Sequence, residues 1–358
     1  MKQVATLSVA LVVALIGSYL AWTDDGETHA AEEVALYSAS EDELESIRWN
    51  TESKDVTIRK KTDARGTYFW VESVERVVPK EPAAPKEEPE EAPPGSSEEE
   101  EGDAAESPAE PSPAEEAPEA PPEPTEKRVA FLGNEQTEAL WADYAPLRAL
   151  RELPADASIP DSTFGLDEPE GTLEVVRRGQ TVTMTIGGET YGSKDRYVRY
   201  EGRTFLIDDG DLRPLQFATT RLVERALYPY AEREIQRIVV ELDGRTDTFV
   251  HQNRDDRAKA YWARAATPEE RDDTVETWVG KLLKLRLRAY VDEKELGPLT
   301  PRFRFRVEGD APWSVEVLQA EGPAGTYYAR SDYNRSLVEL TSSVAENIYE
   351  DLVEVLPE

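Results

Sequence analysis

The strongest constraint on the fold is an internal repeat that relates the two halves of the chain. Elements that recur in one order at a fixed offset indicate a duplicated structural unit. Two segments recur at an offset of 191 positions: Ala35-Leu36-Tyr37 matches Ala226-Leu227-Tyr228, and residues 43–47 match 234–238. Phe69-Trp70 matches Tyr261-Trp262 at an offset of 192. We therefore expect two tandem copies of one fold, in residues 34–225 and 226–358.

Each copy has the pattern of short strands interrupted by two helices. Alternating apolar positions such as Ile47 and Trp49 indicate half-buried strands. A helix is expected at 134–144 and again at 273–284, with Asn134 and Asp273 as N-caps. The last helix of the second copy should bury Val344, Ile348 and Leu352. Because the pairings are mostly local, the sequence predicts an α+β fold with mainly antiparallel sheets and amphipathic helices.

An acidic, proline-rich stretch interrupts the first copy. Residues 81–126 hold 17 acidic residues, one lysine, 12 of the 25 prolines and no aromatic residue. Such a composition cannot bury enough apolar surface to offset the entropy cost of ordering. We expect a disordered insertion over residues 79–128 whose two ends remain close. It is either an acidic spacer or interaction segment, or a tolerated solvated insertion.

The N-terminus carries an apolar run of spanning length. Residues 4–22 contain no charge, Lys2 precedes them, and Asp24, Asp25 and Glu27 follow. The positive-inside rule then places residues 1–3 in the cytoplasm and the body outside, after a polar linker at 23–33. A cleaved signal peptide is the alternative. We expect an uncleaved single-pass anchor in the lipid of a bacterial inner membrane, with the body facing the periplasm or exterior.

The composition excludes several classes of protein. With no cysteine, disulfides, Cys-ligated metals and thiol nucleophiles are excluded. A net charge of −33 argues against nucleic acid as a partner, because the phosphate backbone favours basic proteins. About half of that charge, −16, lies in residues 81–126, so the rest of the chain is only moderately acidic.

Several short sequence motifs together resemble those of one bacterial family. They are Val34-Ala35-Leu36-Tyr37 after the apolar run, Phe164-Gly165-Leu166-Asp167-Glu168-Pro169, Ile186-Gly187-Gly188, Tyr197-Val198-Arg199 and Phe205-Leu206-Ile207-Asp208. The chain resembles the domain of unknown function 4340 family over nearly everything outside residues 79–128. The resemblance implies a membrane-anchored envelope protein, often associated with gliding-motility-type ABC transporter auxiliary components. The long acidic insertion departs from the compact form of that family.

No arrangement of residues in the sequence predicts a catalytic or metal site, and no cofactor is expected. The two histidines are His29, in the polar stretch after the apolar run, and His251, in an expected strand. A catalytic or metal role for His251 is the alternative to an ordinary surface position, which we favour. Residues 208–211 are acidic but lack the ligand pattern of a calcium-binding EF-hand.

Alternating arginines supply the one candidate binding surface. Arg302, Arg304 and Arg306 alternate with apolar residues, as do Arg286 and Arg288. If the two strands are neighbours, one sheet face carries a row of guanidinium groups that suit carboxylates and phosphates. The alternative is a solvated face balanced by Asp and Glu across the sheet. We favour this charge-balanced face; the functional hypothesis is a site for an anionic partner, or for the chain's own segment 81–126.

We expect a noncatalytic accessory or scaffold protein outside the membrane, associated with auxiliary subunits of an ABC-type transport assembly. The alternative is an extracytoplasmic ligand- or polymer-binding module that uses the arginine-bearing faces.

Overall fold

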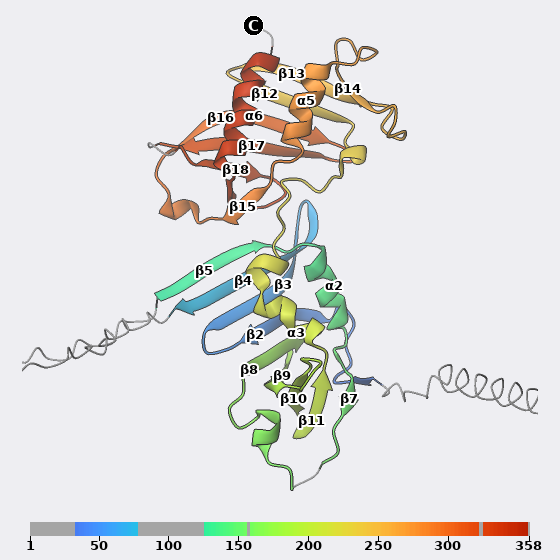
Figure 1. Cartoon of the computed structure of the whole chain (residues 1–358), viewed down its shortest axis with the longest axis vertical. Helices are drawn as coiled ribbons and strands as arrows, with labels where there is room; N and C mark the ends of the chain where they lie inside the picture. The colour runs from blue at the N-terminus through green and yellow to red at the C-terminus, as the bar shows by residue number, and fades with distance from the viewer. Residues whose placement is uncertain (1–32, 78–124, 156–157, 322–324, 357–358) are drawn as a thin grey trace, which may run out of the picture.

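The chain folds into two α+β units that follow one another along the long axis of the molecule (Figure 1). The computed structural model describes residues 33–77, 125–155, 158–321 and 325–356. The first unit comprises the described part of 34–225, and the second unit that of 226–356. Each unit consists of one antiparallel sheet with helices packed on it, so the predicted α+β class is confirmed.

Nine antiparallel strands form the first sheet. Their spatial order is β5 (Thr125–Leu132), β4 (Gly66–Val77), β3 (Lys54–Asp63), β2 (Leu44–Asn50), β8 (Gly171–Arg177), β9 (Gln180–Glu189), β10 (Arg196–Tyr200), β11 (Arg203–Ile207) and β7 (Arg151–Glu152). The short strands β1 (Val34–Ala35) and β6 (Arg148–Ala149) pair beside it. The helices of this unit are α2 (Glu135–Asp143), α3 (Asp209–Gln216) and α4 (Ala218–Arg221), with a 3₁₀ turn at Asp161–Phe164.

Eight antiparallel strands form the second sheet. Their spatial order is β14 (Tyr261–Arg264), β13 (Arg245–Gln252), β12 (Arg237–Leu242), β16 (Leu299–Glu308), β17 (Pro312–Ala320), β18 (Tyr327–Ser331), β19 (Leu337–Leu340) and β15 (Leu287–Tyr290). The helices α5 (Asp273–Leu282) and α6 (Ser342–Val355) pack side by side on one face, and 3₁₀ turns lie at Glu232–Glu234 and Glu293–Glu295. The eight strands of this sheet, read from β14 to β15, have the same connectivity as the eight strands of the first sheet read from β4 to β7. β5 is the additional strand at the edge of the first sheet.

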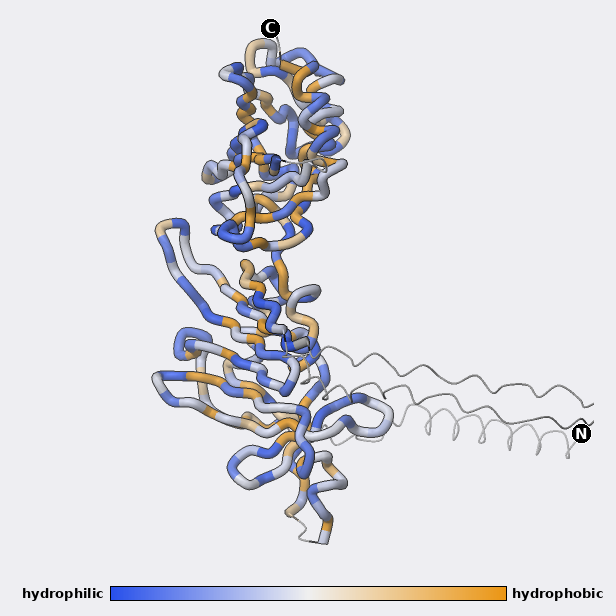
Figure 2. Tube along the Cα trace, turned by 90° about the vertical axis from the view of Figure 1, so that its left-hand side faces the viewer, coloured by the Kyte–Doolittle hydropathy of each residue, from blue (hydrophilic) through white to orange (hydrophobic). Residues whose placement is uncertain are grey.

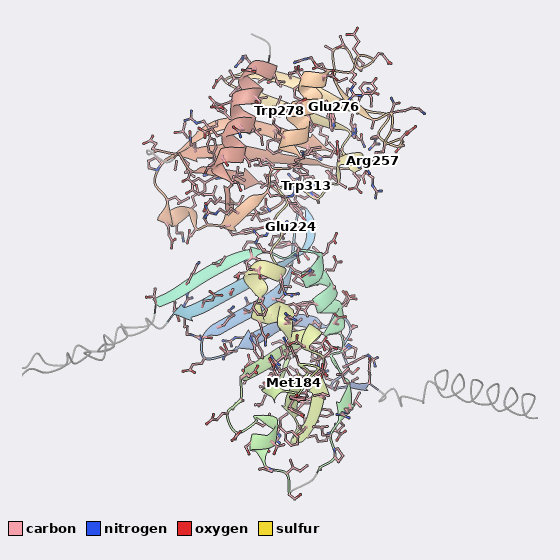
Figure 3. The ribbon with its side chains drawn as sticks, viewed as in Figure 1. Met184, Glu224, Arg257, Glu276, Trp278 and Trp313 are labelled. Atoms are coloured by element: carbon pink, nitrogen blue, oxygen red, sulfur yellow. The ribbon has the colours of Figure 1, made fainter. Side chains whose placement is uncertain are left out.

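The sheet of each unit buries one face against its helices. A tryptophan anchors each helix layer: Trp141 of α2 and Trp278 of α5 are at most 1 % exposed. Their indole N–H groups donate to backbone oxygens of Glu41 and Ile348, at 3.1 and 2.9 Å. Figure 2 shows apolar positions along the inner strands of both units, and Figure 3 shows Trp278 among the helices of the second unit.

Two details of the predicted helices need correction. Asn134 caps α2 as predicted, but the cap of α5 is Asp272, whose carboxylate accepts from the N–H groups of Thr274 and Val275. The sequence holds two consecutive aspartates there, and the pattern alone did not distinguish them. In α6, Val344 is 36 % exposed, while Ala345 is buried together with Ile348 and Leu352. The buried face is therefore rotated by one position.

The acidic insertion connects two paired strands. Val77, at the end of β4, is the register partner of Thr125, at the start of β5, so the ends of the intervening segment are adjacent, as predicted. Residues 125–128, which the sequence assigned to the end of the insertion, belong to β5. Their side chains are exposed, and pairing with the backbone of β4 rather than burial places them in the sheet. Residues 78–124 lie outside the described ranges.

The predicted membrane anchor, residues 4–22, also lies outside the described ranges. Within those ranges, none of the helices combines the length and the apolar character needed to span a bilayer.

The two glycine motifs on which the family resemblance rests pack against each other. Gly165 follows the 3₁₀ turn with a φ of 61°, and a Cβ on it would lie 2.7 Å from the amide nitrogen of Gly188. A Cβ on Gly187 would lie 2.3 Å from the carbonyl oxygen of Phe164. Glycine is therefore required at Gly165 and Gly187 because the loop and β9 approach backbone to backbone.

Candidate functional site

The junction between the two units is the most elaborate polar and aromatic site in the described residues. The turn that joins β3 to β4 projects from the first unit toward the second (Figure 1). Arg65 in this turn pairs with Asp332 at 2.6 Å and donates to the carbonyl of Pro312 at 2.9 Å. In the second contact the arginine belongs to the second unit: Arg335 pairs with Asp63 of the first unit at 2.6 Å. We call these two contacts the junction ion pairs.

Aromatic rings cover both guanidinium groups. Arg65 lies 4.7 Å from the ring centroid of Trp313, and Arg335 lies 4.0 Å from that of Tyr68. The Trp313 ring in turn meets Tyr333 edge to face at 5.5 Å. Stacking and ion pairing act on the same side chains, so each arginine is fixed in two directions. The hydrogen bond from Arg335 lowers the pKa of the Asp63 carboxyl.

The segment that connects the units, residues 224–228, is held by buried polar groups of the second unit. Ser331 Oγ donates to the carbonyl of Leu227 at 2.6 Å, and Asn334 Nδ2 donates to that of Ala226 at 2.9 Å. Tyr290 and Tyr333 donate their hydroxyls to the backbone oxygen and the carboxylate of Glu224. Burial, with the nearby Glu224 charge, raises the pKa of Tyr333. Figure 3 places Glu224 and Trp313 at this junction.

A cleft of about 670 Å³ lies beside these contacts. We call it the inter-unit cleft, since both units contribute to its lining. Its aromatic residues are Tyr68, Phe69, Tyr228, Tyr230, Trp313 and Tyr333. Burial raises the pKa of Tyr228 to about 12, so its hydroxyl stays protonated at neutral pH. The cleft is also lined by four acidic and three basic side chains, so opposite charges nearly balance: Glu41, Glu135, Glu138, Glu224, Lys60, Arg65 and Arg335.

The predicted arginine residues do not form one continuous row. β15, with Arg288, and β16, with Arg304 and Arg306, are separated in the sheet by β17, β18 and β19. Arg286 precedes β15 and donates to the backbone oxygens of Leu283 and Leu285. Arg302 bonds Gln319 at 2.7 Å and lies over the ring of Tyr349 on α6.

The other three predicted arginines have carboxylate partners. Arg304 pairs with Glu316 at 2.6 Å, Arg306 with Glu308 at 2.8 Å, and Arg288 with Glu339 at 2.9 Å. This is the arrangement of the solvated, charge-balanced face that the sequence offered as the alternative.

Arg304 and Arg306 do share one concave surface on the open face of the second sheet. This outer groove, of about 610 Å³, also includes Arg330 and Arg335. Sequence reasoning did not select either. Arg330 ends the segment Tyr327-Tyr328-Ala329-Arg330, which resembles Tyr197-Val198-Arg199 of the first unit, and that resemblance was the available signal. Arg330 bridges Glu293 and Glu316, so the groove contains interleaved charges of both signs.

His251 has the contacts of a structural residue. Its ring stacks on Trp262 with centroids 4.5 Å apart and planes 9° apart, and Nδ1 lies 3.2 Å from the carbonyl of Ile235. His29 lies outside the described ranges. In the part of the chain that the structure describes, three or more His, Asp or Glu side chains nowhere gather as a metal ion would require.

The fold and the junction define a protein of two antiparallel α+β units that share one strand order and are linked by reciprocal ion pairs. The model of a family described as "Domain of unknown function (DUF4340)" matches residues 136–302. This match over residues 136–302 confirms the family resemblance predicted from the sequence. The comparison with curated proteins and the comparison with solved structures each found no match.

The matched residues extend from α2 of the first unit to β16 of the second. The match is narrower than the resemblance inferred from the sequence, but it includes both glycine motifs and the whole connecting segment. Part of the junction therefore lies inside the family region, whereas Asp63, Arg65, Asp332 and Arg335 lie outside it.

Proposed function

We propose that this chain is a noncatalytic accessory or scaffold protein, anchored by residues 4–22 with its body outside the membrane, and associated with an ABC-type transport assembly. The observation that carries the proposal is that two kinds of contact, ion pairs and hydrogen bonds, hold the junction. Two ion pairs in opposite directions, together with the bonds from Tyr290 and Tyr333 to Glu224 of the first unit, hold both units in one orientation. A scaffold needs such a fixed geometry, because it positions partners relative to each other.

Three features of the described residues support a role in interaction rather than chemistry. The outer groove carries charges of both signs, the junction combines aromatic and charged groups, and Glu293, Glu316 and Asp332 of the groove are bound in ion pairs with arginines. The transport association itself comes from the family resemblance.

Copurification of the full chain tests the proposal. The chain is crosslinked in the cells that produce it, extracted with mild detergent, and its partners are identified by mass spectrometry. We expect components of a membrane transporter. A junction variant, Arg65→Glu with Arg335→Glu, should lose them, and the matched control Arg203→Gln, which breaks an exposed pair with Glu152, should keep them. Recovery of no transporter component would contradict the proposal.

The second candidate is a module that binds an anionic ligand or polymer in the outer groove. The observation in its favour is the group of four arginines, Arg304, Arg306, Arg330 and Arg335, on one concave surface. Binding would require the ligand to displace carboxylates already paired with them. Thermal stabilisation of the purified chain by polyglutamate, lost in Arg304→Gln with Arg330→Gln, would favour this candidate over the scaffold.

Contact between the chain's own acidic insertion and these arginines stays a prediction. Since residues 125 and 126 belong to β5, the deletion that tests it should stop at residue 124. If removing 81–124 changes neither the proteolysis pattern nor the salt dependence of the hydrodynamic radius, the insertion does not dock on the arginine-bearing face.

A further inference from the structure

A smaller pocket on another side of the junction is built from both units. Its volume is about 210 Å³, and it lies where β15 of the second unit meets β5 and the segment after α4 (Figure 1). β4 and β5 contribute Ser73, Glu75, Lys127, Val129 and Phe131 to its lining. α4 and the residues that follow it contribute Thr219, Val223 and Arg225, and the second unit contributes Arg288, Ala289 and Tyr290.

The polar lining of this pocket is mainly basic. Glu75 is already paired with Lys54 at 2.9 Å, and Arg288 is paired with Glu339. Lys127 and Arg225, by contrast, form no ion pair with any described residue. Arg225 is oriented by donating to the carbonyl of Arg288 at 3.3 Å. Two cations without counter-ions therefore stand at the pocket in a protein that is otherwise strongly acidic.

Ser73 supplies an independent sign of a ligand. It is 2 % exposed, it lines the pocket, and its Oγ has no hydrogen-bond partner. Buried hydroxyls in folded proteins almost always have a partner, and an unpaired one calls for an explanation. Ser73 of β4 is the register partner of Val129 of β5, and Glu75 is the partner of Lys127. Residues two positions apart in a strand lie on the same face of the sheet, so Ser73 and Lys127 share one face.

Most of the remaining lining is aliphatic or aromatic. Phe131 is 1 % exposed, and its ring lies 6.1 Å from that of Tyr290. The Tyr290 hydroxyl donates to the backbone oxygen of Glu224, outside the pocket lining, which leaves the ring as the pocket wall. A site with cations, one free hydroxyl and an aromatic wall suits a molecule with an anionic end and a short apolar part.

We propose that this basic pocket binds a small organic oxyanion, a carboxylate or a phosphate ester. Lys127 and Arg225 bind the anionic oxygens, Ser73 donates its free hydroxyl to one of them, and the apolar part of the ligand packs on Phe131 and Tyr290. Because the lining residues come from both units, the bound ligand strengthens the junction. The proposal does not depend on the scaffold function.

Binding is measured with the full chain in detergent by titration calorimetry and thermal unfolding. The probes are phenyl phosphate and benzoate, which separate the two oxyanion classes, with benzyl alcohol as the uncharged control. We expect a Kd below about 1 mM for at least one anion, an increase in melting temperature, and affinity that falls with salt. Benzyl alcohol should not bind.

Variants decide which residues act. Lys127→Gln with Arg225→Gln should weaken binding at least tenfold, whereas the control Arg128→Gln, on the same strand but paired with Glu126, should leave it within twofold. Ser73→Ala should weaken binding about threefold or more without lowering the melting temperature of the free protein, because it removes a hydroxyl that has no partner. Binding of neither anion, equal binding of benzyl alcohol, or unchanged affinity in the Lys127/Arg225 variant would each overturn the proposal.

Discussion

Arg335 Nε and Asp63 Oδ2 lie 2.6 Å apart, although 272 positions separate the two residues in the sequence. Arg335 is also stacked on Tyr68, and its side chain is only 15 % exposed. Together with the reverse pair of Arg65 and Asp332, this contact joins the tip of one sheet to a turn of the other.

Removal of the Arg335 guanidinium should therefore weaken the junction more than loss of a typical surface pair. We expect Arg335→Gln to lower the melting temperature by about 2–4 °C, because a stacked and half-buried ion pair is lost. Hydrogen exchange should accelerate at the β3–β4 turn. Arg203→Gln, which breaks an exposed pair, is the control and should shift the melting temperature by less than about 1 °C. Equal shifts for both variants would argue against a special role of the junction.

Asp211 should make the first unit less stable as pH rises. Burial, and then the charges of Asp208, Asp143 and Glu33, raise the pKa of Asp211 to about 7. Its ordinary pKa is about 3.9, so between about pH 4 and pH 7 the folded state binds more protons than the unfolded state. This group thus lowers the free energy of unfolding across that window and contributes no further slope above it.

Asp211→Asn should abolish this contribution and stabilise the chain by roughly 1–2 kcal/mol at pH 8, with little effect at pH 4. Urea unfolding at both pH values measures the difference. A variant that is equally stabilised, or destabilised, at both pH values would contradict the raised pKa.

Gly187→Ala should destabilise the first unit, because the new methyl group would lie 2.3 Å from the Phe164 carbonyl oxygen. A backbone atom cannot move aside as a side chain does, so we expect a loss of roughly 2–3 kcal/mol. Gly280→Ala is the matched control: it lies inside α5 with nothing within 4 Å of the added carbon, and it should stabilise by roughly 0.5–1 kcal/mol. Calorimetric unfolding distinguishes the two signs.

Asn334→Ala should release the connecting segment. The side chain is fully buried and donates to the carbonyl of Ala226 and to the hydroxyl of Tyr290. Its loss leaves those groups unpaired, and we expect a cost of roughly 2–3 kcal/mol. Thr220→Ala, which removes an exposed bond to Phe217, should cost less than about 0.5 kcal/mol. If the two variants have similar stability, the connecting segment is not held as described.

The sequence predicted local elements well where periodicity and turn chemistry determine them. Ile47 and Trp49 are buried in β2 as predicted. Glu201 and Gly202, both with positive φ, turn the chain between β10 and β11, and a glycine at such a position is a hairpin signal. β5 was missed: its first four residues are polar and exposed, and only the pairing with β4 makes them a strand.

The candidate site was less accessible to sequence reasoning. Asp63-Ala64-Arg65-Gly66 reads as an ordinary polar turn, and nothing local indicates that Arg65 meets Asp332, 267 positions away. The arginine row depended on β15 and β16 being neighbours, and a strand order with long connections cannot be derived from alternation alone. The burial of Ser73 could not be predicted either, because it depends on elements that are distant in the sequence and pack around it.

The central claim is that the junction holds the two units in one fixed orientation. Since the chain has no cysteine, spin labels can be attached at Gln180→Cys in the first unit and Glu269→Cys in the second, both exposed positions. Double electron–electron resonance then measures the distance between them. We predict one narrow distance distribution in the native background, which broadens when Arg65→Gln and Arg335→Gln are added. A broad distribution before those changes would contradict the account.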